Sequence, residues 1–185
     1  MGVNRLTAVL ESPPLLPQLS VPSGANSFEQ VKNRMAQEAI LSERAPIVNA
    51  GVHLLSDARF IELRHLIGAL LGNPNGKVRG YLNEAMRTLG MTENEVREKL
   101  GLGEYDSTTP VRGRILQNDR VQGVFILTAV IAKERKKTRP ETEDILTAIL
   151  VHLGDDKNWR ISELTNQANS LIDYIVNSDS LDALF

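Results

Sequence analysis

Two segments of the sequence repeat one pattern of apolar residues and predict the same kind of helix. Residues 64–71 read Arg-His-Leu-Ile-Gly-Ala-Leu-Leu, and residues 143–150 read Glu-Asp-Ile-Leu-Thr-Ala-Ile-Leu. His65 and Asp144 stand at the same place in the two segments, and the helices predicted on either side follow in the same order. Similar segments in the same order indicate a duplicated structural unit. The chain therefore looks like two copies of one helical repeat.

The spacing of apolar residues predicts helices and no sheet. Apolar residues recur three and four positions apart, and no apolar–polar alternation is sustained. Aromatic residues, which strands favour, make up only 4% of the chain. We therefore predict an all-α fold, in which Pro46 opens the second helix and Thr92 with Glu95 forms a capping box. The predicted helices cover residues 27–45, 46–58, 61–71, 78–89, 92–100, 118–137, 140–153, 161–167 and 171–176.

Proline and glycine residues divide the chain into four parts. Residues 1–27 are rich in proline and predict a flexible tail, although their leucines could also pack against the domain or a partner. Residues 28–103 hold an extra helix and the first repeat, and residues 104–178 hold the second repeat. Residues 179–185 form a C-terminal tail. The expected architecture is a pair of four-helix repeats preceded by an extra helix and a Pro-rich tail.

The charge balance argues against nucleic acid and membrane partners. The sequence has 21 Lys and Arg against 23 Asp and Glu, which gives a formal net charge of -2 at pH 7. Proteins that attract nucleic acid or anionic membranes carry a basic field. The longest apolar stretches, residues 124–132 and 145–150, are shorter than the roughly 20 residues that cross a bilayer. Since cysteine and an apolar leader are both absent, the sequence predicts a cytoplasmic protein.

The sequence offers no set of residues for catalysis, a metal or a cofactor. Residues 72–78 (Gly-Asn-Pro-Asn-Gly-Lys-Val) have three residues between their glycines, whereas a phosphate-binding loop needs four and a Ser or Thr after its Lys. The three histidines are too far apart to form a metal pair on one helix. No nucleophile with a neighbouring base can be assembled. We therefore expect a protein that is not an enzyme and that uses no cofactor and no metal.

A basic cluster lies at the end of the helix predicted over residues 118–137. Cations at a helix C-terminus complement the helix dipole, so a solvated helix end explains the cluster. A docking patch for an acidic partner is the alternative. The cluster comprises Lys133, Arg135, Lys136, Lys137 and Arg139.

The repeated segments resemble the N-terminal domain of the Clp-type AAA+ unfoldases. Each repeat of that family carries a stretch like Thr-Glu-His-Leu-Leu-x-Ala-Leu-Leu, followed by a helix ending in Leu-Gly-Val-Asp. Residues 64–71 and 142–150 are similar to the first element, and residues 89–92 (Leu-Gly-Met-Thr) are similar to the second. Residues 42–45 (Ser-Glu-Arg-Ala) resemble the family's Thr-Glu-Arg-Ala. The resemblance covers residues 42–176 and implies two four-helix repeats related by pseudo-twofold symmetry.

The resemblance also implies where a partner would bind. In the family, the glutamate before His-Leu-Leu lies at a site for client proteins, and in some members it recognises phosphorylated arginine. Arg64 and Glu143 stand at that position here. A carboxylate pairs with a guanidinium and arginine repels it, so only Glu143 retains the chemistry for phosphoarginine. The expected partner-binding residues, in a groove between the repeats, are Arg64, His65, Thr142, Glu143 and Asp144.

The function that the resemblance implies is binding of proteins or peptides without catalysis. The chain carries no ATPase module, so we expect a stand-alone relative that acts as an adaptor, decoy or regulator of a Clp-type chaperone or protease. Its partners would be protein or peptide clients, or a Clp-type unfoldase or protease itself. The alternative is a structural subunit that assembles through its apolar tails, residues 1–27 and 181–185.

Overall fold

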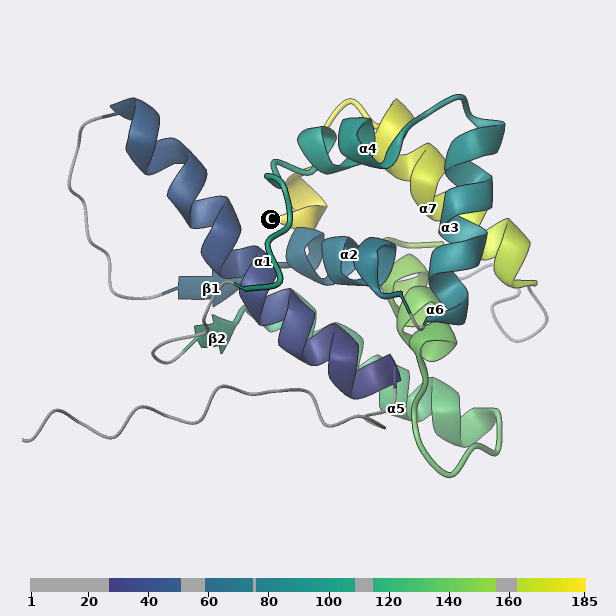
Figure 1. Ribbon diagram of the computed structural model, residues 1–185. Coiled ribbons are helices and arrows are strands. Elements are labelled where there is room, and N and C mark those ends of the chain that lie inside the picture. The colour runs from purple at the N-terminus through teal and green to yellow at the C-terminus, as the bar shows by residue number, and fades with distance from the viewer. Residues whose placement is uncertain (1–26, 51–58, 75, 109–114, 156–162) are drawn as a thin grey trace, which may run out of the picture.

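The computed structural model describes residues 27–50, 59–74, 76–108, 115–155 and 163–185. Residues 1–26 of the tail predicted over residues 1–27 and the predicted helical residues 51–58 lie outside this part of the chain, and Ser27 begins α1. The described residues are mostly helical, as expected (Figure 1). The helices are α1 (Ser27–Ala50), α2 (Leu63–Gly72), α3 (Lys77–Thr88), α4 (Glu93–Lys99), α5 (Asp119–Glu134), α6 (Thr142–His152), α7 (Leu164–Asn177) and the short 3-10 helix η1 (Asp182–Leu184).

Two short strands, which we did not predict, join distant parts of the chain. β1 (Arg59–Ile61) runs directly into the start of α2, and β2 (Ile115–Gln117) precedes α5. The strands pair in parallel, with Phe60 opposite Leu116. Each has only three residues, so no alternation long enough to reveal a strand exists in the sequence.

Two predicted helix boundaries are wrong. α1 is continuous through Pro46, where we expected a new helix. Proline removes one helical hydrogen bond, and a helix can pass through it with a kink. At the other end of the chain, α7 is one helix where we predicted two. Its buried residues Gln167, Ala168, Leu171 and Ile172 form one continuous stripe, with residues 169 and 170 less buried between them. The predicted residues 161–162 lie outside the described part.

The helices pack in pairs around α2. α1 packs along α2, α5 packs along α6, and α3 packs along α7. In Figure 1, α2 lies in the middle of the picture, with α4 and α7 above it, α3 to its right, and α5 and α6 below it. Further contacts join α2 to α3, α6 to α7, α1 to α6, and α2 to α5. Segments on the two sides of the chain's midpoint therefore share one packed unit.

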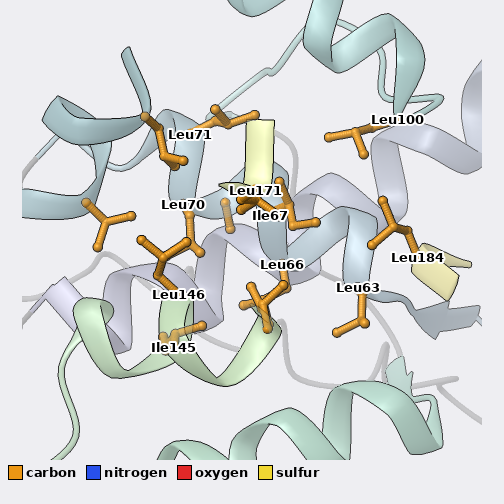
Figure 2. Close-up of a cluster of buried hydrophobic side chains, with 14 of the residues drawn as sticks. Leu63, Leu66, Ile67, Leu70, Leu71, Leu100, Ile145, Leu146, Leu171 and Leu184 are labelled. Carbon is orange, nitrogen blue, oxygen red and sulfur yellow. The ribbon is translucent and has the colours of Figure 1, made fainter. Parts of the chain in front are cut away.

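α2 and α6, the two similar segments of the sequence, form the centre of the core. Every residue of α2 except Arg64 is buried, and in α6 Thr142 and residues 144–150 are buried. Figure 2 shows Leu66 and Leu70 of α2 and Ile145 and Leu146 of α6 as members of one cluster of buried apolar side chains. Burying a leucine or isoleucine side chain contributes about 1.5–3 kcal/mol, so these two helices supply much of the hydrophobic free energy.

Two glycines of α2 allow close packing against its neighbours. A Cβ atom on Gly68 would lie 2.6 Å from Cδ1 of Leu102, and one on Gly72 would lie 1.9 Å from Nη2 of Arg34. Both approaches are too close for any other residue without displacement of the neighbour. The face of α2 that carries Gly68 and Gly72 therefore packs closely against α1 and the loop after α4.

A buried ion pair ties α1 to α4 beside this face. Arg97 donates from Nη1 and Nη2 to the two carboxylate oxygens of Glu38, at 3.0 and 2.7 Å. The Arg97 side chain is 5% exposed and the Glu38 side chain 1% exposed. The guanidinium of Arg34 stacks over the ring of Tyr105, 3.3 Å from its centroid. Removing Arg97 would leave the buried carboxylate of Glu38 with only its longer contact to Nε of Arg34, at 3.7 Å. Such a loss of the main partner of a buried charge is strongly destabilising.

The C-terminal residues, for which we expected a tail, pack on the domain. Leu184 is fully buried, and η1 contacts α2. Arg120 of α5 donates to the backbone carbonyls of Asp182 and Phe185. Because its apolar side chain lies in the core of its own domain, Leu184 is not available to bind another chain in this conformation.

Candidate functional site

The predicted site residues lie at the N-termini of α2 and α6. At the start of α2, the backbone N–H of Glu62 donates to Nδ1 of His65, at 2.9 Å. His65 is buried, and this burial, together with the charge of Arg64, lowers the pKa of its imidazole to about 3. An N–H group can only donate, so Nδ1 carries no proton. His65 is therefore a neutral residue that caps its helix.

Asp144 has the same position and the same capping role in α6. The backbone N–H of Glu141 donates to Oδ2 of Asp144, at 2.9 Å. Asp144 is fully buried and also pairs with Arg135 at 2.8 Å and with Lys137 at 3.0 Å. Burial opposes the charge on Lys137, but its hydrogen bonds to Glu141 and Asp144 raise its pKa overall. The aspartate is thus an internal anchor with two cations, not an exposed binding group.

Arg64 connects the start of α2 to two other segments. Its Nε forms an ion pair with Oε2 of Glu62, at 2.6 Å, and its Nη1 donates to the carbonyl of Gly101, at 3.2 Å. The guanidinium also lies over the Phe185 ring, 4.6 Å from the centroid. A guanidinium can stack and donate at the same time. These contacts commit Arg64 to holding the loop after α4 and the C-terminal residue.

Thr142 and Glu143 form a separate polar contact at the start of α6. Thr142 is buried and donates from Oγ1 to Oε2 of Glu143, at 3.2 Å. The other carboxylate oxygen of Glu143 lies 3.6 Å from Nζ of Lys77, at the start of α3. The Glu143 side chain is 12% exposed. Glu143 therefore keeps a small accessible surface beside Lys77, whose side chain is mostly exposed.

The contacts of these five residues fall into two groups, and the groove predicted between the repeats stays a prediction. Arg64 and His65 belong to the first turn of α2, whereas Glu143 contacts Lys77, which follows the last turn of α2. The 10 residues of α2 span about 15 Å.

The basic cluster has two different roles. Arg135 and Lys137 pair with Asp144, and Lys137 pairs also with Glu141 at 2.7 Å. Since these contacts bind the end of α5 to the start of α6, they explain why cations are needed there. Three further members of the cluster are exposed, namely Lys133, Lys136 and Arg139.

The outer face of α5 carries exposed apolar residues that the sequence analysis did not single out. Ile126 is 69% exposed and Val130 is 50% exposed, with the exposed Ala129 between them. These three residues, which we call the outer α5 strip, lie three and four positions apart and so share one face of the helix. The exposed Lys133 follows one turn later on the same face.

One signal in the sequence could have pointed to this strip. A helix that packs on one side needs one apolar stripe, but residues 124–132 are apolar all round the helix apart from Thr128. α5 uses Val121, Val124 and Ile131 for the core, and Phe125 packs edge-on against Phe28 of α1, with 6.0 Å between ring centroids. The apolar residues beyond that requirement remain at the surface.

Metal-binding and membrane-spanning features are not found among the described residues. No group of three or more His, Cys, Asp or Glu side chains that could hold a metal ion occurs there. Within the same residues, no helix is both long and apolar enough to cross a membrane. His152, near the end of α6, is exposed, and His53 lies outside the described residues.

Comparison with known proteins does not identify the chain. Neither the protein-family models nor the curated proteins give a match.

Proposed function

We propose that this protein binds segments of other proteins through the outer α5 strip and catalyses no reaction. The observation that carries the proposal is the exposure of Ile126 and Val130 on adjacent turns of one helix face. Scattered single apolar residues are normal on a surface, whereas neighbouring ones that form a strip favour contact with a partner. Lys133 at the end of the strip would favour a partner with an acidic residue beside its apolar ones.

We further propose that the fold is a pair of repeats like those of the Clp N-terminal domain. The packing of α1 on α2 has a counterpart in that of α5 on α6, and α2 with α3 has a counterpart in α6 with α7. The cross-contacts of α1 with α6 and of α5 with α2 also correspond. In this assignment α1 is the first helix of the first repeat, not an extra helix. The equivalent caps at His65 and Asp144 support it.

On this fold, we propose the role of an adaptor, decoy or regulator of a Clp-type chaperone or protease in the cytoplasm. The role rests on likeness to the family, and functions vary among proteins that share a fold. Its molecular basis here would be the outer α5 strip, because Arg64, His65 and Asp144 are engaged in contacts within the domain.

The test is a titration of the full chain with a purified Clp-type unfoldase from the same cells, in which calorimetry measures the binding affinity. The variant Ile126→Asp with Val130→Asp places two charges in the strip, and we expect at least a tenfold loss of affinity. A matched control, Asn83→Asp with Asn94→Asp, adds the same charge at exposed positions of α3 and α4. Equal affinity for both double variants, or no binding by the parent chain, would overturn the proposal.

Two additional measurements separate the competing sites. Glu143→Lys tests the site expected from the family resemblance, and a loss of affinity in this variant alone would move the site to the start of α6. Sedimentation of the parent chain and of the Ile126→Asp, Val130→Asp variant tests self-assembly. An oligomer that the variant dissociates would show that the strip binds a second copy of this chain.

A further inference from the structure

We infer that a cavity between the end of α6 and the outer side of α7 binds the cationic side chain, Arg or Lys, of a protein segment. The cavity has a volume of about 350 Å³, which lies at the small end of the range of ligand pockets, about 300–1,000 Å³. It is distinct from the outer α5 strip. The residues that line it are Leu150, Leu153, Asp155, Ser170, Asp173, Tyr174, Asn177 and Ser178.

One wall of the cavity is apolar. Leu150 is 5% exposed, and Leu153 and Tyr174 are half-buried against the core. Arginine and lysine bury their methylene stems on such surfaces while the charged group stays near polar atoms. A long cationic side chain matches this combination better than a short polar one.

Two carboxylates contribute the charge. Asp155 follows α6, where its backbone N–H donates to the carbonyl of Leu150 at 2.9 Å, and Asp173 lies on α7. One oxygen of Asp173 accepts a hydrogen bond from Asn177, at 2.6 Å. Among the described residues, no Lys or Arg pairs with either carboxylate. Two carboxylates at one cavity, neither paired with a cation of the described part of the chain, favour a guanidinium or an ammonium group.

The ends of two helices add to the negative potential. Leu150 belongs to the last turn of α6, and Tyr174 and Asn177 belong to the last turn of α7. The C-terminus of a helix carries a partial negative charge and attracts cations. Lys99, which does not line the cavity, already donates to the carbonyl of Val176 at 2.9 Å. The cavity thus combines an apolar wall, two carboxylates and two helix C-termini.

This proposal rests on the proposed function only for the class of partner, a protein segment, and its test uses a peptide probe rather than a Clp-type partner. The probe is the peptide acetyl-Gly-Leu-Arg-Leu-Gly-amide, titrated into the ¹⁵N-labelled full chain and followed by NMR. Its control is the same peptide with citrulline, which keeps the shape of arginine and removes the charge. We expect the arginine peptide to shift the amides of Ser170, Asp173 and Asn177, and the citrulline peptide to bind at least tenfold more weakly.

The matched variants are isosteric. Asp155→Asn with Asp173→Asn should reduce affinity for the arginine peptide at least tenfold, whereas Asp119→Asn with Glu104→Gln removes the same charge from exposed positions elsewhere. Each titration is repeated with Lys157→Gln and Arg160→Gln, so that cations near Asp155 in the sequence cannot compete. The Ile126→Asp, Val130→Asp variant should bind the probe normally, which separates this site from the strip.

The inference would be overturned if the arginine peptide shifted none of these amides, either in the parent chain or in the Lys157→Gln, Arg160→Gln variant. Equal binding of the arginine and citrulline peptides would overturn it as well, since the proposed recognition depends on charge. Binding that survives Asp155→Asn with Asp173→Asn would place the cation elsewhere and would also refute the site.

Discussion

Nδ1 of His65 and Oδ2 of Asp144 each accept the backbone N–H of the residue before the helix, at 2.9 Å, in α2 and α6. Both side chains therefore cap their helices, but their electrostatic surroundings differ. His65 is buried next to the positive charge of Arg64 and remains neutral, whereas Asp144 is buried between two cations.

His65 should make the stability of the fold depend on pH. Its pKa in the folded chain is about 3, below the ordinary value of 6.5, so the unfolded chain binds a proton first as the pH falls. The stability is complete above pH 6.5 and decreases as the pH falls toward 3. Between pH 8 and pH 5 the loss is about 2 kcal/mol. Urea unfolding at a series of pH values should show this loss, and His65→Gln should remove it. Equal pH dependence in parent and variant would contradict the assignment.

Gly68 and Gly80 should respond to alanine in opposite directions. A Cβ atom on Gly68 meets Leu102 at 2.6 Å and the buried Glu38 at 3.3 Å, so Gly68→Ala should destabilise the fold by about 1–3 kcal/mol. Gly80 lies in α3 with nothing within 4 Å of a Cβ atom, and Gly80→Ala should stabilise the fold by about 0.5–1 kcal/mol. Denaturant unfolding of both variants tests the pair, and changes of equal sign would show that the packing against α2 is looser than described.

Removing Arg97 alone should destabilise the fold more than removing the charges of both Glu38 and Arg97. Arg97→Met leaves the buried carboxylate of Glu38 without its main partner, and we expect a loss of about 3–5 kcal/mol. Adding Glu38→Gln to Arg97→Met removes the stranded charge and should recover part of that loss. A double-mutant cycle from urea unfolding measures this recovery, and simple additivity of the two losses would argue against direct coupling.

Adjacent carboxylates of α6 should differ in their effect on stability. Asp144→Asn removes two ion pairs at a fully buried site and should cost about 2–4 kcal/mol. Glu143→Gln affects one pair with the mostly exposed Lys77, and we expect a change within about 0.5 kcal/mol. Thermal unfolding of the two variants gives the comparison. A larger loss for Glu143→Gln would mean that the contact with Lys77 anchors α3 to α6.

Local signals in the sequence were sufficient for several elements. The predicted capping box is present at the start of α4, where the N–H of Thr92 donates to Glu95 at 2.7 Å and the N–H of Glu95 donates back to Thr92 at 3.3 Å. The correspondence of His65 with Asp144 was also visible as a repeated pattern. These features depend on residues a few positions apart, and such contacts form within one helix.

The candidate sites depended on contacts between distant residues. The strip at Ile126 and Val130 remains exposed because no other described element covers that side of α5, and the apolar pattern alone does not say which side is covered. In the same way, the sequence does not show that Arg64 contacts Gly101, 37 residues away, and the ring of Phe185.

The sequence by itself determined that the chain is helical, where most helices lie and that two of them are alike, because helical periodicity and caps are properties of neighbouring residues. Only the tertiary structure decided which charges are neutralised, as Glu38 is by Arg97 from 59 residues away. It also decided which apolar faces are buried and that Asp155 and Asp173 share a cavity. Burial and charge pairing depend on what surrounds a side chain in space, and the folded packing alone determines those surroundings.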